Sequence, residues 1–484
     1  MKKESRAEAA EGAEKREPNV KPREPRIGLL PLYLALYDKV VPQFRPGREA
    51  FARDLADRLR ARGLDVELAP VCCIRKEITC AVGRFAAKEI DLLATVHLAY
   101  SPSLEAADAL TDPLQPLVLL DTTEATSFDH RATRDDMFAN HGIHGVQDLA
   151  SVLKGRDQDF TVIAGHAADE AFLDEVAATA WAAKAVMALR SCRAVLVGTP
   201  FKGMGDFAVD REVLADELGP EVEQVGIGDF ASAVARVSDA ELDAEARRDA
   251  ESFDLSAVPP EVHRESNRVG LALRAILQEA GAGAFSMNFQ AFDRKAGTPT
   301  VPFLEASKAM ARGVGYAGEG DVLTASFIAA LMAGFGEATF TEMFCPDWQG
   351  NSIFMSHMGE CNVAMAAAKP RIVEKDYAFG NVANPAVALM TLKPGPATLA
   401  NISLGGELGF AILAARVEVL DRGLSPNFPD VPHFWIRPRN ANIRDFLRLY
   451  SEHGGTHHLA LLPGDHADGL RRMADMLGLE FTSL

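Results

Sequence analysis

Apolar runs alternate along the first third of the chain with segments whose apolar residues recur every three or four positions. The runs predict strands at residues 26–36, 65–73, 91–100, 115–122 and 160–166, and the periodic segments predict helices at 48–63 and 167–191. Strands that alternate with amphipathic helices are typical of a parallel sheet covered on both faces. We therefore predict a doubly wound, Rossmann-like α/β domain over residues 26–191.

The same alternation restarts at "CRAVLVGTP", which begins at Cys192, and continues through helices around Leu304 and Leu323. This predicts a second Rossmann-like parallel-sheet domain over residues 192–337. After Phe335 the pattern changes, because glycine and proline become dense and strand-like runs dominate. Residues 338–484 are therefore predicted to form a β-rich C-terminal domain that contains one late helix at 442–455 and a last helix at 467–479.

The length and net charge of the chain indicate several domains and argue against some classes of partner. A chain of 484 residues is too long for one hydrophobic core, and its net charge of −18 argues against a nucleic-acid partner or an anionic membrane surface. No stretch of about 18 apolar residues predicts a membrane span. The six cysteines include no Cys-x-x-Cys pair, and residues 1–25 are mixed-charge with three prolines. We expect a cytoplasmic protein with reduced thiols and a disordered N-terminal tail.

One segment, "GVGYAGEGD" from Gly313 to Asp321, contains a G-x-G-x-x-G pattern. A dinucleotide-binding fingerprint needs a strand before it and a helix that opens on its last glycine, but the preceding "FLEASKAMARG" predicts a helix. The segment also places Glu319 between two glycines, which let the backbone approach a ligand closely. Asp321 is expected to be the N-cap of the next helix. A solvated loop glutamate is the simplest interpretation of Glu319 taken alone.

Two further polar residues lie in apolar strand-like runs. Glu342, in "ATFTEMF", is expected to share a face with Phe340 and Phe344. A carboxylate between two phenylalanines is costly to bury unless it is paired or bound to a metal. His357, in "SIFMSHM", is similarly embedded, although a single histidine on an apolar strand is more often a hydrogen-bonded core residue than a ligand.

Adjacent histidines, His457 and His458, follow a Gly-Gly bend and open the apolar run "THHLALLPG". Three interpretations are open: surface residues, a buried hydrogen-bonded pair, or part of a metal site. Strand geometry sends neighbouring side chains to opposite faces, so only one of the two rings is expected to face a given site. Two glutamates and two histidines without a thiolate suit Mn²⁺, Co²⁺ or Mg²⁺ more than structural Zn²⁺.

The chain resembles the L-arabinose isomerases of the arabinose/fucose isomerase family. The resemblance rests on "GYAGEGD", "FTEMF", "SHMGE" and "GGTHH", in that order, with weaker likeness in "HLAYSP", "NHGIHGVQDL", "VIAGH" and "AFSMNF". It implies two α/β domains and a β-rich C-terminal domain. It also implies a homo-oligomer, trimeric or hexameric, with active sites between subunits and a small sugar as substrate.

The resemblance also implies residue roles. The metal ligands are Glu319, Glu342, His357 and His458, the ion is usually Mn²⁺, and the two glutamates are the acid/base pair. The resemblance further places His144, Phe289 and His457 among the substrate-binding residues. His457 is expected to point away from the metal, where it can orient other groups.

Two departures from the family pattern affect the prediction of which sugar the protein binds. The first strand of the family runs into a Gly-Ser-Gln-His-like turn that helps bind sugar, and here that place reads "GLLPLYLALYD". Phe344 stands where the family has a tyrosine. The resemblance therefore predicts aldose–ketose isomerisation through an enediol, without fixing the sugar. The alternatives are a non-catalytic sugar-binding protein on the same scaffold and a dinucleotide-dependent oxidoreductase.

Overall fold

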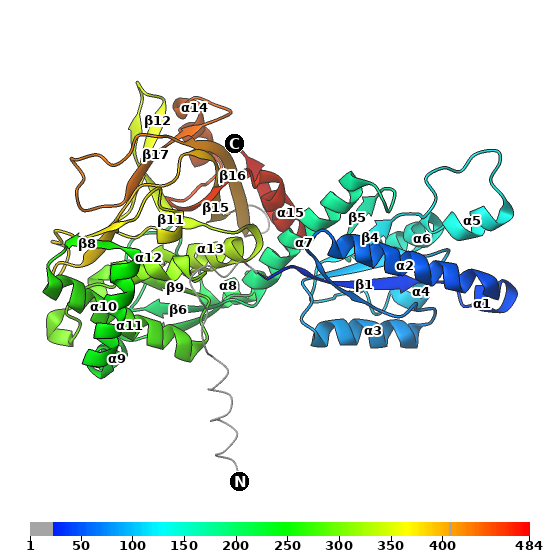
Figure 1. Cartoon of the computed structure of the whole chain (residues 1–484), viewed down its shortest axis with the longest axis horizontal. Coiled ribbons are helices and arrows are strands. Elements are labelled where there is room, and N and C mark those ends of the chain that lie inside the picture. Colours follow the sequence, from blue (N-terminus) through cyan, green and yellow to red (C-terminus); the bar gives the residue numbers. More distant parts are fainter. Residues whose placement is uncertain (1–22, 406–408) are drawn as a thin grey trace, which may run out of the picture.

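The computed structural model describes residues 23–405 and 409–484, and Figure 1 shows two α/β units followed by a strand-rich unit. Residues 1–22 of the predicted tail lie outside the described residues. The last part of that predicted tail is held in place, because Arg23 pairs with the buried Asp91 at 2.6 Å.

Five parallel strands form the N-terminal sheet, in the order β2-β1-β3-β4-β5. They are β1 (Arg26–Leu32), β2 (Asp65–Leu68), β3 (Leu92–His97), β4 (Leu117–Asp121) and β5 (Thr161–Ala164). The helices of this unit are α1 (Tyr37–Val40), α2 (Arg45–Arg60), α3 (Arg75–Ala87), α4 (Ser103–Ala106), α5 (Arg134–Asn140), α6 (Ile143–Lys154) and α7 (Glu170–Arg190).

Neighbouring residues of each strand enter two different cores. Leu29 packs in the core that α2 and α7 cover, whereas Leu30 packs in the core that α3 and α6 cover. Both faces of the sheet are therefore buried, which explains why β1 reads as a continuous apolar run rather than an alternating one.

The central sheet is also parallel, in the order β10-β9-β6-β7. Its strands are β6 (Arg193–Val197), β7 (Glu221–Val225), β9 (Ala284–Met287) and β10 (Gly315–Gly318). Its helices are α8 (Arg211–Leu218), α9 (Ile227–Arg236), α10 (Asp239–Ser252), α11 (Pro260–Ala280), α12 (Phe303–Ala311) and α13 (Val322–Phe335). The apolar helix α13 packs on the sheet and on α7.

The C-terminal sheet contains seven strands in the order β15-β18-β11-β12-β17-β16-β19, and a further pairing of β15 with β16 closes six of them into a ring. The strands are β11 (Thr339–Asp347), β12 (Ser352–Ser356), β15 (Gly395–Leu404), β16 (Phe410–Val419), β17 (His433–Pro438), β18 (His458–Pro463) and β19 (Glu480–Ser483). The helices are α14 (Ile443–Glu452) and α15 (Ala467–Leu477).

A small sheet joins the central and C-terminal units. In it β8 (Asp254–Ala257) pairs in parallel with β13 (Arg371–Glu374), which pairs antiparallel with β14 (Ala386–Leu389). One hydrophobic core also runs from the central sheet through α13 into Ile402 and Leu462 of the C-terminal sheet. The loops at this junction are therefore held by packing on two sides.

The predicted fold class is confirmed: two parallel-sheet α/β units precede a strand-rich unit. The sequence did not predict β19, which follows the last helix and pairs in parallel with β16. Within the described part of the chain, none of the helices has the length and apolar character needed to cross a membrane.

Candidate metal centre

Glu319 lies in the loop between β10 and α13, in an unusual backbone conformation. Its φ is +65°, a left-handed value that residues other than glycine seldom adopt. Several contacts hold it there, because its carbonyl accepts a hydrogen bond from the Phe201 backbone amide at 2.8 Å and the amide of Gly320 donates to the Ser286 hydroxyl at 2.9 Å. Strained residues that the surroundings hold in place are concentrated at functional sites.

Two glycines of this segment allow close packing of the chain around them. A Cβ at Gly315 would lie 2.1 Å from the Ala325 carbonyl oxygen, and one at Gly318 would lie 2.8 Å from the His357 ring. Both glycines belong to β10, with the predicted helix, α12, before them. Gly318 therefore lets His357 approach the loop that carries Glu319.

The sheet brings Glu342 and His458 face to face. Glu342 of β11 is directly opposite His458 of β18 in the antiparallel register, and His458 Nε2 lies 3.2 Å from Glu342 Oε1. Side chains at such opposed positions are neighbours on one face of a sheet. His458 Nε2 also lies 3.6 Å from Glu319 Oε2, so this one imidazole lies between the two predicted catalytic carboxylates.

His357 follows β12 and approaches the site from the other side of Glu342. Its Nε2 lies 3.5 Å from Glu342 Oε1, and its Nδ1 bonds to the buried Glu360 at 2.8 Å. The ring of Phe340 meets His357 and His458 edge-on, with centroids 4.8 and 4.9 Å away. Phe340 and Glu342 thus face the same side of β11, as predicted. Phe344, predicted to share that face, is about half exposed, and the register of β11 with β12 shifts between Met343 and Cys345.

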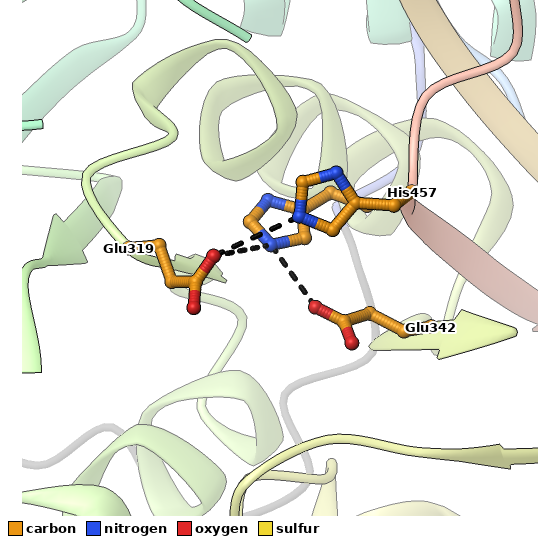
Figure 2. A group of neighbouring side chains, drawn as sticks. Glu319, Glu342 and His457 are labelled. Carbon is orange, nitrogen blue, oxygen red and sulfur yellow. Dashed lines mark ion pairs between the residues drawn. The ribbon is translucent and has the colours of Figure 1, made fainter. Parts of the chain in front are cut away.

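The expectation that His457 points away from the site is wrong. Its ring centroid lies 4.2 Å from that of His458, and its Nε2 lies 3.7 Å from Glu319 Oε2 (Figure 2). The strand begins only at His458, so His457 occupies the bend before it and the alternation of side chains along a strand does not apply.

Four side chains could hold one ion. The ligand atoms of Glu319, Glu342, His457 and His458 all lie within 4.8 Å of one another. This group contains three of the four predicted ligands; the fourth, His357, lies 3.5 Å from Glu342 but is not in the group. Among the described residues, Glu319 Oε2 and His458 Nε2 find no hydrogen-bond partner although both atoms are buried. A buried polar atom without a partner is costly, and a divalent cation with oxygen and nitrogen ligands would satisfy both. The donor set therefore fits the expected metal.

The charges of the site favour a cation. Burial by itself would raise the pKa of Glu319, but the imidazoles of His457 and His458 lower it to about 2. Burial would likewise raise the pKa of Glu342, and the neighbouring histidines lower it. Burial would lower the pKa of His458, yet the carboxylates around it, Asp321 first, raise it well above its usual range. The same carboxylates would hold a divalent cation in place of protons.

Sequence reasoning missed three carboxylates and one ring that complete the site. Asp206, Asp321 and Glu360 each bond a histidine, and Phe207 stacks on His458 with centroids 4.9 Å apart and planes 6° apart. Asp321 was identified only as a helix N-cap, a role that is confirmed by the 2.8 Å bond from the Thr324 amide to its Oδ1. Glu360 ends the "SHMGE" segment, three residues after His357. No signal in the sequence marked Asp206 or Phe207, which approach from a distant loop.

Of the two other predicted substrate-binding residues, Phe289 lies near the loop of Glu319 and His144 lies in the N-terminal unit. Phe289 begins the short helix η2 (Phe289–Ala291), and its ring lies 5.7 Å from that of Phe201, whose amide bonds Glu319. His144 lies in α6 of the N-terminal unit, and Figure 1 shows α6 at the opposite end of the molecule from β11. Within one chain His144 is therefore not part of the site.

Comparisons with known proteins agree with the resemblance seen in the sequence. The family model of the L-arabinose isomerase central domain matches residues 208–335, and that of the C-terminal domain matches residues 337–480. The L-arabinose isomerase of Herpetosiphon aurantiacus is 28% identical over 409 residues, which are 82% of this chain and 80% of the relative. That of Serratia proteamaculans is 26% identical over 461 residues, 91% of this chain and 90% of the relative. The two family models together span more than half of the chain, which belongs to the L-arabinose isomerase family of aldose–ketose isomerases.

Proposed function

We propose that this chain is a sugar isomerase that depends on a divalent metal and converts an aldose to a ketose through an enediol intermediate. The observation that carries the proposal is the position of the His458 imidazole between the carboxylates of Glu319 and Glu342, with buried atoms of the group left unpaired. Mn²⁺ is the proposed ion, and Co²⁺ and Mg²⁺ offer the same charge.

The reaction moves a proton between C1 and C2 of the sugar, so it needs a base close to a weakly acidic C–H bond. Both glutamates have lowered pKa values and are unprotonated at neutral pH, which is the form that a general base must have. When bound, the ion would act as a Lewis acid that stabilises the negative charge developing on the sugar oxygens.

The two carboxylates divide the proton movements between carbon and oxygen. One glutamate removes the proton from C2 of the aldose and returns it to C1, while the other moves a proton between the hydroxyl and carbonyl oxygens. The stacked Phe207 and the edge-on Phe340 cover two sides of the His458 ring. They exclude water from that part of the site and strengthen its electrostatic interactions.

We further propose that the enzyme is a homo-oligomer, trimeric or hexameric, in which His144 reaches the site of a neighbouring subunit. The surroundings of His144 support this, because large apolar side chains nearby are exposed: Leu36, Val40, Met137 and Ile143. Tyr37 and His141 tie these segments together through a 2.9 Å contact. Light scattering gives the subunit number, and a sugar-bound structure with His144 remote from every ligand would contradict its role.

The test of the function is a panel of aldopentoses, 6-deoxyhexoses and hexoses, L-arabinose included, assayed for ketose formation with and without a chelator. We expect turnover of at least one aldose, its loss with the chelator and its best recovery with Mn²⁺ or Co²⁺. Full turnover after exhaustive metal removal would contradict the metal requirement. Absence of turnover on every sugar in the presence of bound Mn²⁺ would contradict the isomerase assignment.

A further inference from the structure

The three histidines around Glu319 and Glu342 differ in how far they are exposed. The side chains of His357 and His458 are 3% and 0% exposed, whereas that of His457 is 40% exposed. A sugar reaches the site from solvent, so the exposed ring is the one that it meets first. His457 therefore lies on the open side of the site, and the other two imidazoles lie on the enclosed side.

One carboxylate on a distant loop, that of Asp206, holds both the backbone and the ring of His457. Its Oδ2 accepts a hydrogen bond from the His457 amide at 3.0 Å and lies 2.6 Å from the ring Nδ1. An ionised carboxylate can only accept hydrogen bonds, so Nδ1 carries the proton. The free atom of the ring is then Nε2, which lies 3.7 Å from Glu319 Oε2 (Figure 2).

The loop that carries Asp206 is fixed to the site, although it joins β6 to α8 in the central unit. Phe207, the next residue, stacks on the His458 ring, and the Phe201 amide donates to the Glu319 carbonyl at 2.8 Å. The carboxylate is therefore held in place by contacts on both sides of it in the loop. Such a group can orient its partner rather than follow it.

We propose that Asp206 is a positioning residue of the isomerase, which holds the His457 ring so that Nε2 meets an oxygen of the sugar. This inference rests on the proposed function, because it needs a sugar in the site. Asp206 lies outside the segments that the two family models match, residues 208–335 and 337–480, and outside the motifs that carry the resemblance.

The separation of His457 and Glu319 fits a shared sugar oxygen. Two atoms that each bond one oxygen at about 2.8 Å lie no more than about 5.6 Å apart. The 3.7 Å between His457 Nε2 and Glu319 Oε2 is within that limit and is too long for a direct hydrogen bond. In either protonation state Nε2 can bond the oxygen, as an acceptor from a hydroxyl or as a donor to a carbonyl.

The predicted metal ligands do not depend on Asp206. The ring of His357 is held by Glu360 at 2.8 Å, and that of His458 is held by Asp321 at 2.9 Å. Loss of the Asp206 carboxylate should therefore leave the metal in place and release only the third ring. Sugar binding and turnover would then fall while metal affinity stayed the same, which a general loosening of the site would not produce.

Steady-state kinetics of the full-length, Mn²⁺-loaded protein test the proposal, with the sugar of the panel that turns over fastest. We expect Asp206→Ala to lower kcat/KM by at least about 10-fold, since misplacing a group by 1 Å can cost about 10²-fold. Asp206→Asn keeps an acceptor for both hydrogen bonds and should recover most of the loss. Asp216→Ala, at an exposed position on α8, is the matched control.

A double variant tests whether Asp206 acts through His457. His457→Ala alone should lose at least as much as Asp206→Ala, and the two changes together should lose no more than His457→Ala alone, because residues that work as one unit are not additive. If Asp206→Ala does not fold, Asp206→Glu keeps the charge, displaces the carboxylate by one methylene and takes its place in the cycle.

Calorimetric titrations give two readouts that need no turnover. The Kd for Mn²⁺ in Asp206→Ala should equal that of the wild type. The Kd for the alditol of the same sugar, L-arabinitol in the case of L-arabinose, should rise about 5- to 10-fold, as expected for the loss of one hydrogen bond.

Unchanged kinetics and unchanged alditol affinity in Asp206→Ala would overturn the inference alone. So would additive losses in the double variant, or a loss of Mn²⁺ binding, because Asp206 would then support the site as a whole. A wild type that turns over no sugar of the panel would overturn the proposed function, and this inference with it.

Discussion

Two clusters of buried charge lie within the same half of the molecule, and they differ in whether their polar atoms are paired. On α10, α11 and α12, Glu245, Asp249 and Glu305 are at most 3% exposed and are bonded to Arg274, Lys308, Arg312, His263 and Asn267. In the candidate metal centre, by contrast, Glu319 Oε2 and His458 Nε2 have no hydrogen bond from any described residue. In the first cluster the carboxylates are paired with side chains of the same chain. In the second cluster two buried polar atoms remain without a partner and are available to a ligand.

This difference distinguishes a structural charge network from a candidate active site where burial alone does not. Burying a charge is costly in both places, and partners from the chain offset that cost only in the first. The atoms that remain unpaired in the metal centre therefore mark where an ion and a substrate would contribute. Variants in the two clusters should accordingly change different properties of the protein.

The largest expected effect is on stability, in the paired cluster. Lys308 bonds Glu245 and Asp249, the latter at 2.6 Å, and the change Lys308→Met removes the cation while keeping most of the volume. We expect the free energy of unfolding to fall by about 3–5 kcal/mol, because both carboxylates lose a buried cation and Asp249 keeps no lysine or arginine partner among the described residues. Denaturant unfolding measures it, and turnover per folded molecule should not change.

Arg264→Met is the control for that change, because Arg264 pairs with the exposed Asp239 and Asp243 on the same helices. Exposed pairs contribute about 1 kcal/mol or less. A loss of stability in Lys308→Met no greater than that in Arg264→Met would refute the view that the paired cluster is structural.

The next effect is on catalysis, in the metal centre. Glu319→Gln and Glu342→Gln keep the shape of the side chain but remove the base, so each should lower turnover by at least about 10²-fold, which is roughly 2.7 kcal/mol of barrier. The unfolding free energy should change far less than in Lys308→Met. Glu337→Gln, at an exposed position shortly before β11, is the matched control. Near-normal turnover in either variant with metal bound would remove that glutamate from the acid/base pair.

The smallest effect is a shift in acid sensitivity. Burial would raise the pKa of Glu245 and of Asp249, but hydrogen bonds and the charge of Lys308 lower both below their usual values. Carboxyls with lowered pKa values stabilise the fold fully above about pH 4.5, and that contribution is lost as the pH falls further, at up to about 1.4 kcal/mol per pH unit for each group.

In Lys308→Met both carboxyls lose the charge of Lys308, although Glu245 keeps Arg274, so the loss should begin at a higher pH than in the wild type. Unfolding free energies measured between pH 3 and pH 7 test the shift. Superimposable pH profiles of the two proteins, apart from a constant offset, would contradict it.

Much of the fold and part of the site could be predicted from the sequence because the controlling signals are local. Apolar runs and helical spacing predicted the five strands of the N-terminal sheet and β6 of the central sheet. They did not mark β7, which is mostly exposed, or β10, which is short and glycine-rich. The Gly-Glu-Gly-Asp segment indicated Glu319 and the N-cap Asp321. His457 shows where such reasoning fails: alternation was applied one residue before the strand begins. Asp206 and Phe207 could not be predicted, because their loop meets β18 only through packing between units about 250 residues apart in the chain.

The place of β18 within its sheet determines when the site can form during synthesis. This strand, which begins at His458, lies between β15 and β11, although it is made later than either of them. Chains fold largely unit by unit from the N-terminus, and pairing between distant strands is slow. Glu319 and Glu342 are therefore made well before their histidine partner, and the candidate metal site can form only after β18 has been translated.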